Sequence, residues 1–187
     1  MELTANELEE LAHRRDQLRA RYMAPRDERA PTPARGVHHV ALLCSDVERT
    51  IGFYQDLIGF PLTDLFENRD YAGSTHLFFD IGNGNFLAFF DFPGLDLGPY
   101  AEVLGGLHHL AISVDPDRWE DIRTRLDSVG HDYQVVKTSL YLPDPDGARI
   151  ELIADPLGEM YGRRVGQEPP RGPGSGNGTG TGSTPRG

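Results

Sequence analysis

Two similar stretches of sequence constrain the fold of this chain more than any other feature. They are Gly36-Val-His-His-Val-Ala-Leu-Leu-Cys-Ser-Asp46 and Gly106-Leu-His-His-Leu-Ala-Ile-Ser-Val-Asp115. Each has a His-His pair that opens an apolar strand, and each ends at an Asp before a helical pattern. Self-similarity of this kind indicates a chain built from repeated structural units. The sequence therefore predicts two copies of one module.

Each half of the chain has a pattern that predicts one strand, one helix and three further strands. The first half has a strand over 37–44, a helix over 46–58 and strands near 61–67, 75–81 and 86–92. The second half has a strand over 107–114, a helix over 116–129 and strands near 132–137, 138–143 and 148–154. The predicted fold class is α+β, with paired βαβββ modules that form a cupped, mixed eight-stranded β-sheet with flanking helices.

The segments outside the modules have a different composition. Residues 1–35 are predicted to form an N-terminal helix, which a Thr4 and Glu7 capping box would start, and a Pro-containing linker. The helix is expected either to pack on the body or a partner subunit or to stay solvated. The domain is predicted over 36–156, with modules at about 36–94 and 106–156. Residues 157–187 are predicted to be a flexible Gly/Pro-rich tail, because its sequence offers little to bury.

Composition excludes several classes of partner. A formal net charge of -11 opposes binding to a phosphate backbone, so nucleic acid is not expected as a partner. Nowhere does the chain approach the ~20 consecutive apolar residues that span a bilayer, and its N-terminus has no apolar signal segment. We therefore expect no membrane partner and a cytoplasmic location. The single cysteine, Cys44, lies in an apolar run and is predicted to be buried and inert.

Three residues at equivalent or convergent positions suggest a metal centre. Aligning Gly84-Asn-Phe-Leu-Ala88 with Gly147-Ala-Arg-Ile-Glu151 places Glu151 where the first half has Ala88. If the halves pair about a pseudo-twofold axis, equivalent strands converge on one cavity, which would bring His39, His109 and Glu151 together. Two imidazoles and one carboxylate are a typical ligand set for a divalent metal.

Several separated motifs resemble those of the vicinal oxygen chelate superfamily, which includes glyoxalase I, extradiol ring-cleaving dioxygenases, fosfomycin-resistance proteins and methylmalonyl-CoA epimerase. The motifs are His39-Val-Ala-Leu with Asp46, Phe53-Tyr54-Gln-Asp-Leu-Ile-Gly59-Phe, His109-Leu-Ala-Ile-Ser-Val-Asp115 and Asp144-Pro-Asp-Gly147-Ala-Arg-Ile-Glu151. The resemblance covers about residues 36–156. It implies metal ligands on the first and last strand of each module.

Residue by residue, the family's ligand positions correspond to His39, Ala88, His109 and Glu151. Ala88 cannot bind a metal, and glyoxalases have a carboxylate at its position. The remaining two histidines and one carboxylate resemble the ligand triad of the ring-cleaving dioxygenases. Such a triad suits Fe(II) or Mn(II) with open positions for substrate oxygens and O₂. Fe(II) is therefore favoured, with Mn(II), Zn(II) and Ni(II) as alternatives.

The resemblance also points to a tyrosine and exposes a missing histidine. The related dioxygenases have a tyrosine ten residues before the ligand Glu, which corresponds to Tyr141, either a hydrogen-bond donor to a substrate oxygen or an aromatic of the cavity wall. Their catalytic histidines correspond to Gly84–Asn85 and Val136, which are not histidines here. His76 is the candidate substitute as general acid or base, with a structural histidine as the alternative.

A phenylalanine-rich segment is predicted to line the substrate pocket. Alternation along a strand puts Phe86 and Phe90 on the same face as Ala88, and Phe78 occupies the position that corresponds to Tyr141. These side chains favour an apolar or aromatic small-molecule substrate. Core packing of the same rings is the alternative interpretation.

The expected function is that of an Fe(II) extradiol-type dioxygenase acting on a small apolar or aromatic substrate with adjacent oxygens. One alternative is a redox-neutral, glyoxalase-like lyase, isomerase or epimerase. The other is a non-catalytic protein that sequesters a ligand, as bleomycin-resistance proteins do. Homodimers are common among the proteins that this chain resembles, so a homodimer is expected. The sequence leaves open whether the modules pair within one chain or between two.

Overall fold

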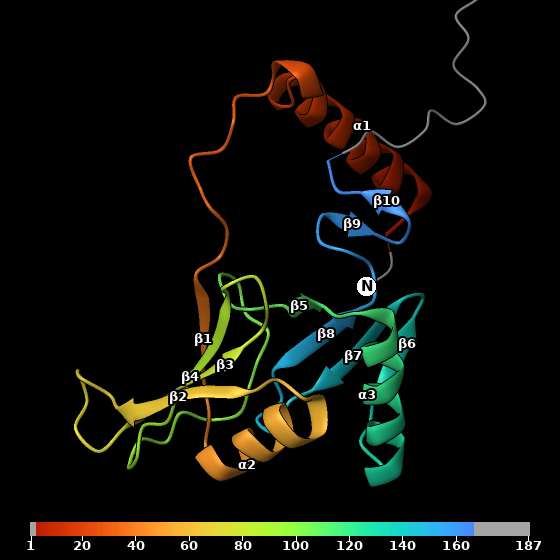
Figure 1. Ribbon diagram of the computed structural model, residues 1–187. Helices are drawn as coiled ribbons and strands as arrows, with labels where there is room; N and C mark the ends of the chain where they lie inside the picture. Colours follow the sequence, from red (N-terminus) through yellow and green to blue (C-terminus); the bar gives the residue numbers. More distant parts are fainter. Residues whose placement is uncertain (1–2, 167–187) are drawn as a thin grey trace, which may run out of the picture.

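The computed structural model describes residues 3–166, which contain both predicted modules (Figure 1). The first module consists of β1 (His39–Leu43), α2 (Val47–Ile51), the π-helix η2 (Gly52–Ile58), β2 (Leu62–Glu67), β3 (Thr75–Asp80) and β4 (Phe86–Phe90). The second consists of β5 (Leu110–Ser113), α3 (Pro116–Val129), β6 (Gln134–Val136), β7 (Ser139–Pro143) and β8 (Arg149–Ile153). The α+β class and the βαβββ order are confirmed.

The two modules share one strand order and one register. Their sheets run β1-β4-β3-β2 and β5-β8-β7-β6, and only the pairs β1 with β4 and β5 with β8 are parallel. Ala41 pairs with Ala88 in the first sheet, and Ala111 pairs with Glu151 in the second. The glycine-anchored alignment that equates Ala88 with Glu151 is therefore correct.

The eight strands are divided between two four-stranded sheets, whereas one cupped sheet of eight was expected. The edge strands β1 and β5 lie on either side of a cavity of about 1230 Å³, whose lining includes Val40, Ile58 and the segment 110–115. Among the described residues, side-chain packing and not strand pairing holds the modules together.

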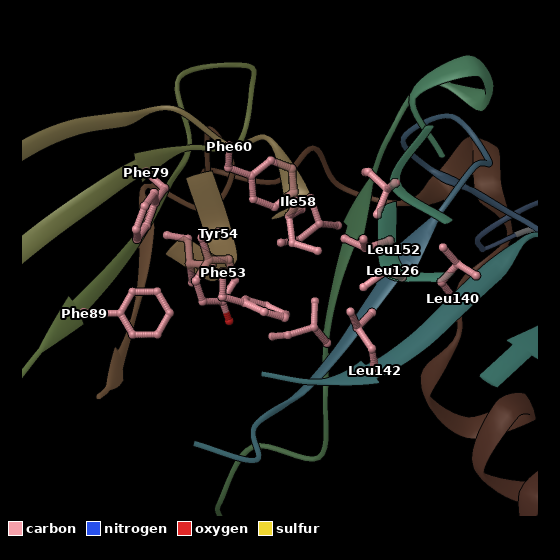
Figure 2. Packing of buried hydrophobic residues seen from close by; sticks show 14 of the residues in the cluster. Phe53, Tyr54, Ile58, Phe60, Phe79, Phe89, Leu126, Leu140, Leu142 and Leu152 are labelled. Atoms are coloured by element: carbon pink, nitrogen blue, oxygen red, sulfur yellow. The ribbon is translucent and has the colours of Figure 1, made fainter. Parts of the chain in front are cut away.

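The helices of the first module fill the space between the sheets. Figure 2 shows Phe53, Tyr54 and Ile58 between the aromatic side chains of the first sheet and the leucines of the second. The Tyr54 hydroxyl is buried and donates a hydrogen bond to Asp144 Oδ2 at 3.1 Å, across the module boundary. Burial raises the pKa of the Asp144 carboxyl and that of the Tyr54 phenol.

Arg125 of α3 joins the modules at a second point. Its guanidinium donates to the carbonyls of Leu57 and Ile58, at 2.7 and 2.9 Å. These carbonyls belong to the last turn of η2, where intrahelical partners run out. Gly59 ends that turn with φ of 96°, a left-handed conformation that favours glycine. Both apolar contacts and these hydrogen bonds therefore hold α3 against η2.

Each sheet buries only one of its faces in the shared core. The buried inward residues are Leu77, Phe79, Leu87 and Phe89 of the first sheet and Leu140, Leu142, Ile150 and Leu152 of the second. Because successive side chains of a strand alternate between faces, the residues between them point away from the core. Ala88 and Glu151 therefore lie on the outer faces of their sheets, which turn away from the shared core, although both residues are buried there.

The N-terminal helix α1 (Ala5–Tyr22) begins at Thr4 with the predicted capping box, in which Glu7 and Thr4 bond reciprocally. None of its residues is buried, so within this chain α1 is solvated. A short 3₁₀ helix, η1 (Arg26–Glu28), follows it in the linker. No helix within residues 3–166 combines the length and apolarity needed to cross a bilayer.

Part of the segment predicted to be a flexible tail forms regular structure. Residues 157–166 include a hairpin of β9 (Glu159–Met160) and β10 (Arg163–Arg164). Tyr161 and Gly162 form its two-residue turn with φ of 54° and 75°, as turns of the I′ type require. Composition did not indicate this turn, because the residues that follow it in the sequence are also rich in glycine. The rest of the predicted tail, Gln167–Gly187, lies outside the described residues.

Cys44 is buried and free, as its apolar surroundings predicted. Removal of the thiol from water is the main reason that its pKa rises from 9.0 to about 11. The thiol is therefore protonated and unreactive at neutral pH.

Leu126→Ala should lower the free energy of unfolding by about 2 to 5 kcal/mol, because Leu126 is fully buried where α3 meets the first module. Val129→Ala is the matched control on the same helix. Val129 is 63% exposed at the end of α3, so its loss should cost no more than about 0.5 kcal/mol. Urea denaturation measures both values, and equal losses would contradict this description of the core.

Candidate metal centre

Glu151 and His109 form the centre of the candidate site on the second sheet. Glu151 lies in the middle of β8 with a side chain that is only 3% exposed. Its Oε2 is 3.1 Å from His109 Nε2, and its Oε1 accepts a hydrogen bond of 2.6 Å from Ser139 Oγ. A buried carboxylate is costly unless a cation or hydrogen-bond donors compensate it. This arrangement is therefore suited to hold a cation beside the imidazole.

The His-His pairs orient the two candidate histidine ligands. His109 Nδ1 is 2.6 Å from His108 Nδ1, and His39 Nδ1 is 3.0 Å from His38 Nδ1. Such a contact needs one protonated Nδ1 and one acceptor. When the ligand histidine donates from Nδ1, its Nε2 lone pair is available for a metal. The donors therefore fit a divalent metal bound through imidazole nitrogens and one carboxylate.

His39 lies on the other sheet, apart from this pair. Its ring is 6.0 Å from that of Phe78, and it pairs in register with Phe86. Within residues 3–166 of one chain, no group of three or more His, Cys, Asp or Glu residues is arranged to bind one ion. The physical reason is that the inner faces of both sheets are used by the common core. The structure thus brings His109 and Glu151 together and leaves His39 on the opposite outer face.

Tyr141 lies beside the candidate carboxylate. It pairs in register with Glu151 across β7 and β8, and its ring is 5.9 Å from that of His109. Burial, followed by hydrogen bonds to Tyr161 and Glu151, raises the pKa of the Tyr141 phenol. Tyr141 is therefore a protonated hydrogen-bond donor at neutral pH. This is the state that a contact to a ligand oxygen requires.

The hydroxyl groups of Ser139, Tyr141 and Tyr161 form a cluster beside Glu151, the hydroxyl cluster. The sequence did not predict that Tyr161 belongs to it. Its hydroxyl lies 3.3 Å from that of Tyr141 and 3.4 Å from Ser139 Oγ. It comes from the β9–β10 hairpin, which lies outside the two repeated modules. The adjacent pair Tyr161-Gly162, a turn signal, was the only local hint.

His76 lies on the first sheet among aromatic rings. Its ring stacks on Phe90 at 3.8 Å and is 4.3 Å from Phe78. Within the described part of the chain, its buried Nε2 has no hydrogen-bond partner. Burial lowers the pKa of His76, and the neighbouring His39 lowers it further. A neutral imidazole with a free nitrogen is able to accept a proton.

The three phenylalanines of the predicted pocket share the outer face of the first sheet. Phe78 pairs with Ala88, and the Phe78 and Phe86 rings are in edge contact at 6.2 Å. Phe78, Phe86 and Phe90 are half-buried, unlike Phe79 and Phe89, which are fully buried in the core. None of the three lines the cavity between β1 and β5, nor a second cavity of about 940 Å³ beside residues 91–100. The candidate pocket is thus an open face that another surface would have to cover.

Comparison with known proteins identifies the family. Residues 36–152 match the family model of the Glyoxalase/Bleomycin resistance protein/Dioxygenase superfamily. The chain belongs to this superfamily. The match ends before the β9–β10 hairpin.

Individual relatives are more distant. The chain is 27% identical over 143 residues to a Bacillus subtilis (strain 168) protein named "Putative ring-cleaving dioxygenase MhqA", with coverage of 71% of this chain but only 44% of that protein. It is 31% identical over 125 residues to the uncharacterized protein YaeR of Escherichia coli (strain K12), covering 62% and 93% of the two chains. The fosfomycin resistance protein FosX of Mesorhizobium loti shares the fold, with a TM-score of 0.51, 21% identity and coverage of 66% and 94%.

The pKa of His76 should lie below the value of about 6.5 that is usual for histidine, because burial disfavours the imidazolium. NMR titration of the ring protons measures it. His39→Ala should raise the pKa of His76 by removing a neighbouring positive charge, and Asp64→Asn should lower it by removing a negative one. A wild-type midpoint above 6.5 would contradict this environment.

Proposed function

We propose that this protein is an extradiol-type dioxygenase that uses Fe(II) and acts on a small apolar or aromatic substrate with adjacent oxygens. The observation that carries the proposal is the buried Glu151 and His109 pair, 3.1 Å apart, beside the protonated phenol of Tyr141. The similarity to MhqA supports it, although this chain spans less than half of that protein. The proposed ligands are His39, His109 and Glu151, and a cytoplasmic location stays a prediction.

We further propose that the site is completed by a second copy of the chain. The sheet faces that carry His39 and Glu151 both turn away from the shared core, and within residues 3–166 of one chain no third ligand joins His109 and Glu151. On the His39 face, Leu43 is 48% exposed and Phe66 is 43% exposed. Exposed apolar side chains of this kind favour contact with another surface. In the proposed homodimer, the first module of one chain covers the second module of its partner.

Each residue then has a distinct task. A bound divalent metal would polarise the adjacent substrate oxygens and, as Fe(II), leave a position for O₂. Ser139 holds one oxygen of Glu151, so the carboxylate keeps its orientation. Tyr141 donates a hydrogen bond to a substrate oxygen, and His76 accepts a proton from the substrate. Phe78, Phe86 and Phe90 contact the apolar part of the substrate and exclude water.

Anaerobic loading with Fe(II), followed by oxygen-uptake measurements with catechols, tests the reaction. The expected result is metal binding and oxygen uptake that depends on the catechol. Metal binding without oxygen uptake would contradict the dioxygenase proposal and favour a redox-neutral reaction. Absence of metal binding would contradict both and favour ligand sequestration.

The variant Glu151→Ala should lose at least about tenfold in metal affinity, because it removes the one anionic ligand. Glu120→Ala is the control, since Glu120 is an exposed acid of α3 that pairs with Arg123. Metal analysis of freshly purified, unchelated protein gives the comparison. Unchanged metal content in Glu151→Ala would remove Glu151 from the site.

Mixing two inactive variants tests the proposed sharing of the site. His39→Ala and Glu151→Ala should each abolish metal-dependent activity alone. A dimer of one chain of each kind has one site with both defects and one intact site. Because random exchange makes half of all dimers mixed, activity should return to about a quarter of the wild-type value. No recovery on exchange would show that each site lies within one chain.

A further inference from the structure

The β9–β10 hairpin holds Tyr161 in place over the second sheet. The backbone N–H of Tyr161 donates to Asp155 Oδ2, and Val165 N–H donates to the Gly158 carbonyl at 2.8 Å. The Lys137 ammonium lies 4.7 Å from the centroid of the Tyr161 ring, a cation–π distance. Two backbone hydrogen bonds thus hold the hairpin, and one cation–π contact holds the ring itself. The Tyr161 hydroxyl therefore lies in a fixed position beside the Tyr141 hydroxyl.

The protons of this cluster can be assigned by counting donors. A serine hydroxyl has one proton, and Ser139 uses it in the short bond of 2.6 Å to Glu151 Oε1. In the contact between Ser139 and Tyr161, the donor must then be Tyr161. The single Tyr161 proton thus has two acceptors in reach, Ser139 Oγ at 3.4 Å and the Tyr141 oxygen at 3.3 Å.

The choice between these acceptors decides where the Tyr141 proton points. If Tyr161 donates to Ser139, its oxygen accepts the Tyr141 proton, which is then turned away from the site. If Tyr161 donates to Tyr141, the Tyr141 proton turns toward Glu151, where it can donate to the carboxylate or to a ligand oxygen beside it. Both contacts are longer than the 2.5–3.0 Å that is usual between hydroxyl groups, so exchanging one for the other costs little.

We propose that Tyr161 is a positioning residue of the candidate site. It orients the Tyr141 hydroxyl so that this hydroxyl donates to a negatively charged substrate oxygen. The inference rests on the proposed function and extends it beyond the family-matched residues 36–152. It also narrows the substrate class. A ligand with a catecholate-type acceptor oxygen beside the metal gains from this pair of phenols, whereas a ligand without such an oxygen does not.

Binding of 4-nitrocatechol to the Mn(II)-loaded protein tests the inference without relying on turnover. Tyr161→Phe keeps the aromatic ring but removes the hydroxyl, so it should weaken binding of the probe about fivefold. Because Tyr161 acts through Tyr141, the same substitution in a Tyr141→Phe background should change the affinity less than about twofold. Affinity for Mn(II) itself should be unchanged. Absorbance titration of the four proteins gives the full cycle.

A second variant and a control separate positioning from loss of structure. Asp155→Ala removes the acceptor of the Tyr161 backbone while keeping both phenols, so it should also weaken probe binding. Tyr133→Phe should bind like the wild type, because the Tyr133 hydroxyl donates to Asp127 at 2.7 Å, outside the hydroxyl cluster.

Several outcomes would overturn the inference. Wild-type affinity in Tyr161→Phe, effects that simply add to those of Tyr141→Phe, or lost Mn(II) affinity in Tyr161→Phe would each do so. If the wild-type protein itself binds neither Mn(II) nor the probe, the proposed function fails and the inference fails with it. That outcome is seen before any variant is measured, so the two failures are distinguishable.

Discussion

The packing of Tyr54 between the two sheets is the constraint on which the rest of the structure depends. Its ring lies 4.9 Å from that of Phe89 and 5.4 Å from that of Phe79, and its hydroxyl bonds to Asp144 of the other module. Buried apolar area is the main favourable term in folding, so both sheets turn their apolar faces to this core. The candidate ligands His39 and Glu151 are thereby placed on the outer faces of their sheets. The hydrophobic effect, and not metal binding, decides where the candidate ligands lie.

The duplicated modules then differ in what their outer faces carry. The second sheet concentrates charge and proton donors, with Glu151, Ser139 and Tyr141 on one face. At equivalent positions the first sheet has Ala88 and Phe78, and aromatic rings surround His76. One face is thus suited to binding a cation and oxygens, and the other to an apolar ring. Neither face alone makes an enclosed site.

Local patterns account for what could be predicted from the sequence. Strand alternation and the glycine anchors Gly84 and Gly147 gave the equivalence of Ala88 and Glu151, because both signals act within a few residues. The separation of His39 from Glu151 depends on how two modules pack, and no short pattern encodes that packing. Tyr161 was not predicted as a site residue, for another reason. Its turn lies next to a long Gly-rich segment whose composition masked it.

The contacts of Glu151 indicate why this site could accept a cation with little rearrangement. Its two carboxylate oxygens have different partners, Ser139 for Oε1 and His109 for Oε2. A cation that enters between Oε2 and His109 Nε2 replaces only the second contact, since both atoms are metal-ligand donors. The Ser139 bond, and the tyrosine hydroxyls behind it, persist in either state. An outer shell that need not reorganise is what allows a metal ligand to be held in one orientation.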